Sequence, residues 1–287
     1  MTDRIAALPM YDWPEVRAET NAQWARIRDA LRTAGIDAPE TLTRETGDLY
    51  DFWRRPELLF AQTCWGPMGD GLAEHVHVIG QPDYSDVEGG EGEFYRSVVL
   101  MCESDLDELS GSVAPLSVLP DISPARGEIS LVVAVPKLAE PVTRVISPLA
   151  GEMSGRTEGG AVGELPSRTI AHLIRNKRFA YNVPDSMSGY LALQADLGSL
   201  DLFSEQIPTG GHRASIRAVA SNHADVCAID CRSWALARLH EPAAANLIPI
   251  GWTTPRKGLP YITSRNTPPE TVAAMRAALM DAGLIVA

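Results

Sequence analysis

The sequence predicts an α/β protein, built either as two domains or as one large domain split into lobes. Short apolar runs typical of buried strands alternate with segments whose apolar residues recur at helical spacing, and this order is typical of α/β layers. The length of 287 residues is long for one undivided domain and sufficient for two. With 45% hydrophobic and 22% charged residues, the chain has the composition of a globular protein with a substantial core.

The first hundred residues contain four predicted strands and one long helix. Residues 5–10 form a short buried strand. A helix follows from about Pro14 to Gly35, since Pro suits a first helical turn and Gly suits a helix end. Further apolar runs predict the other three strands, at residues 58–61, 76–80 and 95–102.

Residues 103–166 differ in composition from the rest of the chain. They are rich in Gly, Pro, Ser and Glu, and they carry ten acidic and four basic residues with one apolar run at 129–135. We therefore expect a surface excursion, with a hairpin of its own, between two strands of the core.

The remaining sequence resumes the pattern of strands and helices. Strands are predicted at residues 178–182, 226–229, 247–250 and 261–263, and helices at 186–197, 214–221 and 232–239. A last helix opens at Pro268 and Pro269, and Gly283 ends it.

The charge of the chain excludes two classes of partner. The chain has 25 basic and 37 acidic residues, a formal net charge of −12, which would repel nucleic acid and an anionic membrane surface. No apolar run approaches the roughly 20 residues that span a bilayer, so no membrane insertion is expected. The apolar run at 5–11 is too short for a signal peptide. The sequence as written therefore predicts a cytoplasmic protein, or a periplasmic one if the start is misassigned or a leader was removed.

Metal, cofactor and thiol chemistry are not expected. Cys227 and Cys231 lie four residues apart, but no second pair completes a zinc set. His75 and His77 share one face of a strand and lack Asp or Cys partners nearby in sequence, so we interpret them as an edge-strand pair. Cys64 lies in a loop with no sequence neighbour that would activate a thiol.

The segment from 181 to 190 carries the strongest functional signal. A strand ends there, a turn containing Pro and Asp follows, and a helix begins at the serines. The unpartnered N–H groups of a helix start, together with Ser186, Ser188 and Gly189, favour binding of an anion that has several oxygens. The six acidic and six basic residues within 167–230 balance, so hydroxyls and amides would hold that anion. The alternative, that Ser186 is only a helix N-cap, stays open.

Two further segments place polar groups beside helix starts. Gly210 and Gly211 precede His212, which offers an N–H donor or, near neutral pH, a charge; the alternative is a flexible loop with a surface histidine. Asp230 ends a buried strand, where ligands of open α/β sheets bind, and it would equally well cap the next helix. A hydrolase triad of Ser, His and Asp is disfavoured, because no Gly-x-Ser-x-Gly elbow is present.

With these motifs the chain resembles the phosphonate- and phosphate-type substrate-binding proteins of ABC transporters, which are type II periplasmic binding proteins. The resemblance covers residues 5–102 and about 167–287. It rests on Leu-Pro-Met-Tyr at 8–11, Leu-Phe-Ala-Gln-Thr at 59–63, Phe-Tyr-Arg-Ser at 94–97, the segment 178–190, Gly-Gly-His at 210–212 and Ala-Ile-Asp at 228–230. The excursion at 103–166 and the absence of a leader depart from the family pattern.

The resemblance implies a two-lobed type II periplasmic-binding-protein fold with the ligand in the cleft between the lobes. Two hinge strands would cross between the lobes near 84–97 and 228–233. Lobe 1 would comprise residues 1–90 and 234–287, and lobe 2 residues 91–233 with the excursion at 103–166. The implied ligand residues are Tyr95, Ser186, Ser188, Gly189, His212 and Asp230, with Tyr11 and Gln62 from the facing lobe.

The expected function is binding of a phosphate, phosphite or phosphonate by a solute-binding protein of an ABC-type uptake system. An ABC permease would be its partner, and no cofactor or catalysis is expected. The alternative is a cytoplasmic ligand sensor or adaptor that is recognised by a partner protein; the missing leader and the acidic excursion favour it. An enzyme on the same fold is a weaker hypothesis, because the motifs hold no paired carboxylates and no nucleophile–base pair.

Overall fold

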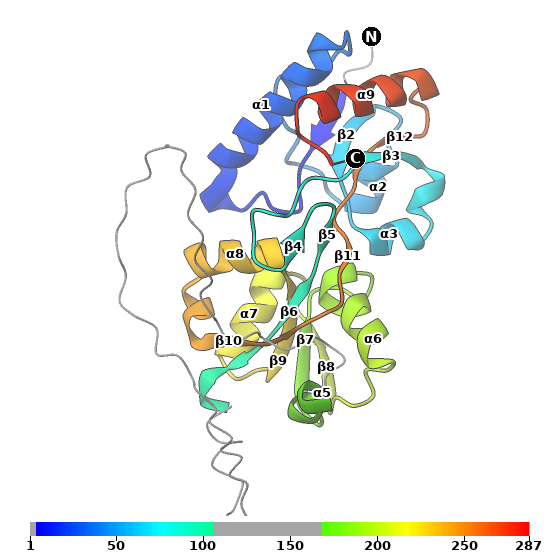
Figure 1. Ribbon diagram of the computed structural model, residues 1–287. Helices are drawn as coiled ribbons and strands as arrows, with labels where there is room; N and C mark the ends of the chain where they lie inside the picture. The colour runs from blue at the N-terminus through cyan, green and yellow to red at the C-terminus, as the bar shows by residue number, and fades with distance from the viewer. Residues whose placement is uncertain (1–3, 106–167, 287) are drawn as a thin grey trace, which may run out of the picture. The chain divides into compact units, whose positions relative to one another are not determined.

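The computed structural model describes residues 4–105 and 168–286, which fold around two separate β-sheets (Figure 1). The excursion predicted at 103–166 lies outside the described residues apart from its first three positions. The described part is mixed α/β, as the sequence predicted. None of its helices is long and apolar enough to cross a membrane.

The first sheet has four strands in the order β1–β2–β12–β3. Their bounds are Ile5–Ala7 for β1, Leu58–Gln62 for β2, Val76–Gly80 for β3 and Tyr261–Ser264 for β12. β1 runs parallel to β2, whereas β12 is antiparallel to both of its neighbours. Every residue of β2 is buried, as expected of a strand in a sheet that is covered on both faces.

Helices cover both faces of this sheet. On one face lie the long helices α1 (Arg17–Thr33) and α9 (Pro269–Asp281), whose buried residues Trp24 and Met275 share a core with Phe60. On the other face lie two helices that the sequence did not predict, α2 (Leu49–Trp53) and α3 (Trp65–Gly69).

The second sheet has five strands in the order β10–β6–β9–β7–β8. Their bounds are Ser97–Cys102 for β6, Arg178–Tyr181 for β7, Glu205–Pro208 for β8, Val226–Asp230 for β9 and Leu247–Trp252 for β10. Because successive side chains of a strand point to opposite faces, Val98 and Leu100 of β6 enter one core and Val99 and Met101 enter another. Helices α7 (His212–Ala220) and α8 (Cys231–His240) cover the first of these cores. Helices α5 (Arg168–Ile174) and α6 (Ala192–Leu197) cover the second.

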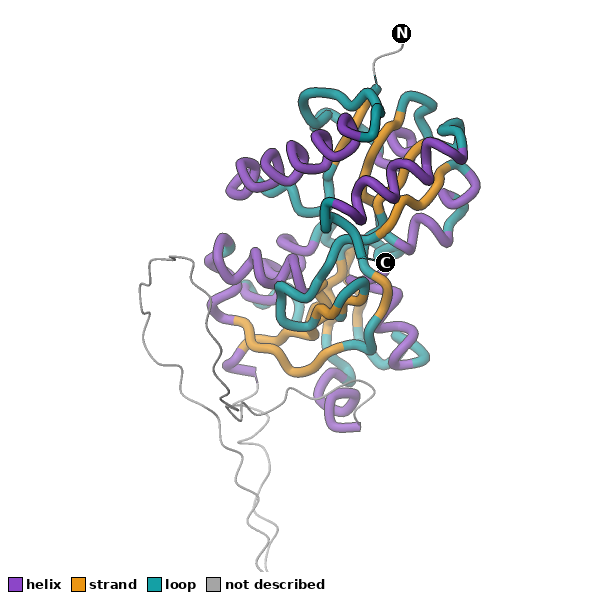
Figure 2. Tube along the Cα trace, turned by 45° about the horizontal axis from the view of Figure 1, so that its top comes forward, coloured by secondary structure: helices purple, strands orange, loops and turns teal. Residues whose placement is uncertain are grey.

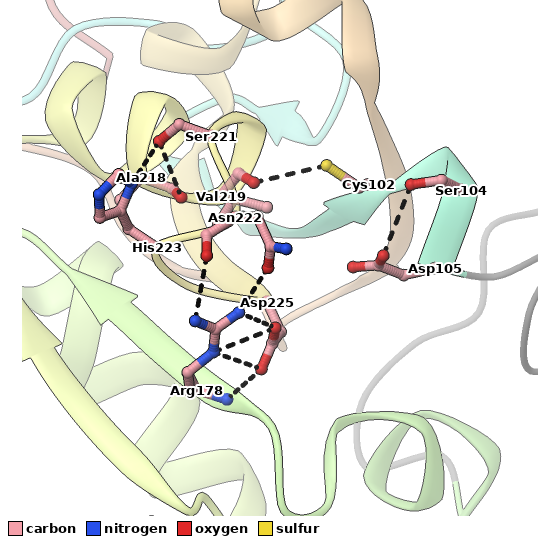
Figure 3. A network of polar contacts seen from close by, with 10 residues as sticks. All are labelled: Cys102, Ser104, Asp105, Arg178, Ala218, Val219, Ser221, Asn222, His223 and Asp225. Atoms are coloured by element: carbon pink, nitrogen blue, oxygen red, sulfur yellow. Dashed lines mark hydrogen bonds and ion pairs between the residues drawn. The ribbon is translucent and has the colours of Figure 1, made fainter.

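An ion pair fixes the start of β7 beside the turn that precedes β9 (Figure 3). The Arg178 guanidinium donates to the Asp225 carboxylate at 2.6 Å, and the Arg178 amide donates to the same carboxylate at 2.7 Å. The guanidinium also donates to the Asn222 carbonyl at 3.0 Å. β7 runs parallel to both β8 and β9, so the segments that follow these three strands meet at one edge of the sheet.

The chain passes between the two sheets twice (Figures 1 and 2). The first crossing contains β4 (Gly90–Glu91) and β5 (Phe94–Tyr95), and the second contains β11 (Arg256–Lys257). These three short strands pair in the order β11–β5–β4. The first crossing agrees with the one expected near 84–97, whereas the second differs from the one expected near 228–233.

The second crossing lies later in the sequence than expected, because α8 keeps the chain beside the second sheet. Asp230 caps α8, whose Trp234 and Ala237 are buried in the core of the second sheet. β10 then pairs with β6, and the chain leaves this sheet only after Trp252. Residues 234–252 therefore lie with the second lobe, and the boundary expected between 233 and 234 moves to about residue 253.

Tyr84 packs against both crossing segments. Its ring is stacked on that of Tyr95 with 5.5 Å between centroids, and its hydroxyl accepts a hydrogen bond from the Leu259 amide at 3.0 Å. A Cβ at Gly258 would lie 2.1 Å from the Tyr84 ring, and a Cβ at Gly90 would lie 2.1 Å from the Tyr84 carbonyl oxygen. Glycine at these two positions is what allows the crossings to pack so closely.

Asp196 of α6 ties the second crossing to the second lobe. Its buried carboxylate accepts hydrogen bonds from the Thr254 amide at 2.7 Å and from the Thr254 hydroxyl at 2.8 Å. The Arg256 guanidinium pairs with the same carboxylate at 2.6 Å. Three donors thus satisfy one buried charge, as such a charge requires.

Candidate functional site

A cavity of about 580 Å³ lies between loops of the two lobes. On the side of the first lobe, three segments line the cavity. Tyr11 lies after β1, Asp48 and Tyr50 lie at the start of α2, and Cys64 lies after β2. The second lobe lines it from the edge where β7, β8 and β9 end, with Asn182, Asp185, Ser186, Ser188, His212 and Asp230. The topology of the second sheet therefore explains why three motifs far apart in sequence meet at one site.

Ser186 and Ser188 lie at the start of the helical segment that follows β7. Ser186 is the N-cap of a π-helical turn, Met187–Leu191, and its Oγ accepts a hydrogen bond from the Gly189 amide at 3.1 Å. It also accepts one from Asn182 Nδ2 at 2.8 Å. Both serines are buried and both line the cavity, so Ser186 is an N-cap and a cavity residue at once.

Gly189 is enclosed by side chains of the site. A Cβ at this position would lie 2.0 Å from Asn182 Oδ1 and 3.2 Å from His212 Cε1. No real Cβ approaches an oxygen to 2.0 Å, so a larger residue would displace Asn182 or the helical turn. Gly189 itself is not among the residues that line the cavity.

His212 is the first residue of α7, and its side chain is 14% exposed. Its Nε2 lies 2.9 Å from Ser188 Oγ and 3.3 Å from Asp230 Oδ2. Burial lowers the pKa of this imidazole below 6.5, and the Asp230 carboxylate opposes that shift. Within the described part of the chain, Nδ1 is buried without a hydrogen-bond partner. Gly210 supplies the left-handed backbone, with φ of 84°, from which the loop enters the helix.

Asp230 ends β9 and faces both lobes. Its Oδ1 accepts hydrogen bonds from the Ser233 amide at 2.8 Å and from the Tyr11 hydroxyl of the first lobe at 3.1 Å. Burial, and next the Asp230 charge, raise the pKa of Tyr11 well above its ordinary value, so this hydroxyl stays protonated and donates. The Tyr11 hydroxyl also lies 3.4 Å from that of Tyr84.

Besides Gly189, two of the expected ligand residues, Tyr95 and Gln62, do not line the cavity. Tyr95 is buried, and its hydroxyl approaches Ser188 without forming a hydrogen bond of good geometry. Burial raises the pKa of Tyr95 well above its ordinary value. Gln62 is buried in β2, where it pairs with Tyr261 of β12. Both residues stay predictions as direct ligands.

The sequence did not single out several residues that line the cavity. The Tyr50 hydroxyl donates to Asp185 Oδ2 at 2.5 Å, and Cys64 Sγ accepts a hydrogen bond from the Met187 amide at 3.4 Å. Burial raises the pKa of the Cys64 thiol, which argues against a reactive thiolate. Tyr50 could not be found from sequence, because its short helix leaves too few residues for a periodic pattern.

The charged groups of the cavity wall do not supply a net positive charge. Arg213 lines the cavity, but its guanidinium pairs with Glu15 at 2.8 Å and with Glu241 at 2.6 Å. Asp48, Asp185 and Asp230 also line it. An oxyanion here would rely on hydroxyl and amide donors, as the balanced charge of 167–230 predicted. Among the described residues, no group of three His, Cys, Asp or Glu could hold a metal ion.

A cavity between two α/β lobes, lined by hydroxyls at helix starts, is the arrangement of a binding protein of the periplasmic type. Residues 147–284 match the family of periplasmic substrate-binding proteins of ABC phosphonate transporters. The resemblance predicted from the sequence motifs is thereby confirmed over the second half of the chain. No curated protein matches the chain in sequence.

Solved structures support the same fold over nearly all of the chain. The binding-protein component of an ABC phosphonate transporter from Pseudomonas aeruginosa is 13% identical, with a TM-score of 0.56 over 96% of this chain and 73% of that one. PhnD1 from Prochlorococcus marinus, solved in complex with methylphosphonate, is 12% identical, with a TM-score of 0.59 over 97% of this chain and 84% of that one. A histidine kinase sensor domain with similarity to periplasmic binding proteins is 11% identical, with a TM-score of 0.51 over 97% of this chain and 89% of that one.

These likenesses identify the fold. At 11–13% identity they show the fold alone, and that fold is the two-lobed one expected from the sequence. The matched family and the phosphonate-transporter neighbours are binding proteins and not enzymes, in agreement with the prediction.

Proposed function

We propose that the protein binds phosphate, phosphite or a phosphonate in its interlobe cavity, as the solute-binding component of an ABC-type uptake system. One observation carries the proposal: residues predicted as ligands from separate motifs line a single cavity that both lobes form. These residues are Tyr11, Ser186, Ser188, His212 and Asp230. The family match supplies the transporter context, in which a permease is the partner.

The chemistry of the wall supports an oxyanion ligand. Two serine hydroxyls stand at a helix start, where backbone N–H groups and the helix dipole favour negative charge. The buried imidazole of His212 lies beside Ser188 and becomes a second donor when it takes up a proton. Asp230 is an acceptor, so it suits a ligand that carries a hydrogen on one of its oxygens or on an amine.

Isothermal titration calorimetry with phosphate, phosphite and methylphosphonate tests this function. We expect micromolar or tighter binding of at least one anion by the native protein. Ser186→Ala should weaken it about tenfold or more, because a hydrogen bond to a charged group is lost. Ser221→Ala, at the exposed end of α7, is the matched control and should bind as the native protein does. No heat with any of the three anions contradicts the proposal.

A ligand sensor is the second candidate function. The likeness to the sensor domain of a histidine kinase favours it, because it shows that this fold also serves in signalling proteins. Fractionation of source cells with an antibody to the protein separates the two roles. Recovery from the periplasm is expected for uptake and argues against a cytoplasmic sensor; recovery from the cytoplasm argues the reverse.

A further inference from the structure

The Ser186 hydroxyl has both of its acceptor positions filled. Asn182 Nδ2 donates to Ser186 Oγ at 2.8 Å, and the Gly189 amide donates to it at 3.1 Å. A serine hydroxyl has two lone pairs and a single hydrogen. The O–H bond of Ser186 must therefore point in the remaining direction, away from both donors.

No acceptor among the described residues takes that hydrogen, and Ser186 lines the cavity. Ser186 is 5% exposed, so bulk water is a poor alternative partner. A buried donor without an acceptor is unfavourable. The arrangement thus prepares one O–H group for an acceptor atom inside the cavity.

The direction of the Ser186 O–H bond depends on the orientation of the Asn182 amide, whose Oδ1 is buried without a hydrogen-bond partner among the described residues and lies against Gly189, while Nδ2 faces Ser186. Asn182 Oδ1 lies 2.0 Å from the point where a Cβ of Gly189 would stand, which places this oxygen against a Cα hydrogen of Gly189. A carbonyl oxygen makes a favourable contact with a Cα–H group, whereas an NH₂ group there would repel it. The Nδ2 group therefore faces Ser186, where it donates.

We propose that Asn182 is a positioning residue for anion binding: its amide holds the Ser186 hydroxyl as a donor directed at the ligand. This role rests on the proposed function and adds a residue outside the motif serines and histidine. It selects ligands that present an acceptor oxygen to Ser186, and it disfavours those that present an O–H or N–H group at that point.

A double-mutant cycle with methylphosphonate as the probe tests the proposal. In the native background, Asn182→Ala should weaken binding about tenfold, because the Ser186 hydroxyl is then no longer held in the direction of the ligand. In a Ser186→Ala background the same change should have little further effect. In a Ser188→Ala background, the matched control, it should cost about tenfold again.

Asn182→Asp adds a readout that a purely structural role would not move. Its carboxylate accepts the Ser186 hydrogen and turns the donor inward, so binding should fall further than with Asn182→Ala at pH 7.5. Near pH 4 the protonated acid donates again, and the loss relative to native protein should shrink. Because the new charge also repels an anion, the same variant in the Ser186→Ala background corrects for that repulsion.

Distinct outcomes overturn the two proposals. Equal losses from Asn182→Ala in the native and Ser186→Ala backgrounds, or no loss in the native background, would remove the positioning role and leave anion binding intact. Native protein that binds none of the three anions removes both. The isosteric Asn182→Asp variant keeps the test valid if Asn182→Ala fails to fold, which circular dichroism will reveal.

Discussion

The Tyr50 hydroxyl donates a hydrogen bond of 2.5 Å to the Asp185 carboxylate, and this bond joins the first lobe to the second. Tyr50 and Asp185 line the same cavity as Ser186 and Ser188, so this bond lies at the cavity wall. Burial and the bond to Asp185 raise the pKa of Tyr50, so the phenol stays protonated. A second contact reinforces the closed arrangement, because a Cβ at Gly66 would lie 1.5 Å from the Asp185 carbonyl oxygen.

Tyr50→Phe should weaken ligand binding about two- to tenfold by removing one interlobe hydrogen bond. The loss should appear mainly as faster dissociation, because the closed state retains the ligand. Stopped-flow fluorescence with methylphosphonate measures both rates. Tyr190→Phe, which removes a hydrogen bond of 3.0 Å to Gln206 within the second lobe, is the matched control and should change neither rate.

Gly189→Ala should reduce both binding and stability. The added methyl group meets Asn182 Oδ1 at 2.0 Å, so the helical turn must shift, at a cost of about 1–3 kcal/mol in the free energy of unfolding. Urea denaturation and calorimetry measure the two effects. Gly69→Ala has no heavy atom within 4 Å of the new Cβ and should be nearly neutral. A Gly189→Ala protein that binds normally would show that the turn is not needed for the ligand.

His212 should make the stability of the free protein fall in acid. Its pKa in the folded protein is lowered from 6.5 by burial, so below pH 6.5 the unfolded chain binds a proton that the folded protein resists. Neutral His212 therefore does not weaken the folded protein above pH 6.5, and the stability falls as the pH drops below that value. His212→Gln should flatten the profile between pH 7 and 5, as followed by urea denaturation. His75→Gln on the surface should leave it unchanged.

Anion binding should move the His212 equilibrium in the opposite direction. A bound negative charge favours the imidazolium form, so the native protein should take up protons when it binds. Calorimetry in buffers of different ionisation enthalpy measures this uptake near pH 6. His212→Gln should lower it, and equal uptake by native and variant protein would contradict a protonated His212 in the complex.

Asp196→Ala should destabilise the fold by about 3–5 kcal/mol, because it leaves Arg256 and two Thr254 donors without their buried acceptor. Thermal and urea unfolding measure the change. Asp201→Ala is the control, since Asp201 is exposed. A small effect of Asp196→Ala would mean that the second crossing is held to its lobe by packing instead.

Most strands of the two sheets were predictable because they are short apolar runs, and burial dictates that pattern. The edge strand β8 was not predicted, because its residues are mostly polar and exposed. α2 and α3 were not, because five residues are too few to show helical periodicity. The second crossing was misplaced because an apolar run such as β10 could belong to either sheet. Only its pairing with β6 shows that β10 belongs to the second sheet. Among the cavity residues of the second lobe, the sequence predicted Ser186, Ser188, His212 and Asp230, because they lie at strand ends and helix starts. Tyr50 contacts Asp185, which is 135 residues away in sequence, so the sequence could not place the two together. Asn182 lies within the segment that the sequence singled out, but the sequence does not show that its amide bonds the Ser186 hydroxyl.

Tyr84 connects the cavity wall to the second crossing segment. Its hydroxyl contacts both the Leu259 amide in the second crossing and the Tyr11 hydroxyl, which in turn donates to Asp230. Any rotation of one lobe away from the other must stretch this relay at the point where the backbone bends. If the proposed ligand is held by closure of the lobes, occupancy of the cavity and stiffness of the crossing segments would therefore depend on each other through Tyr84.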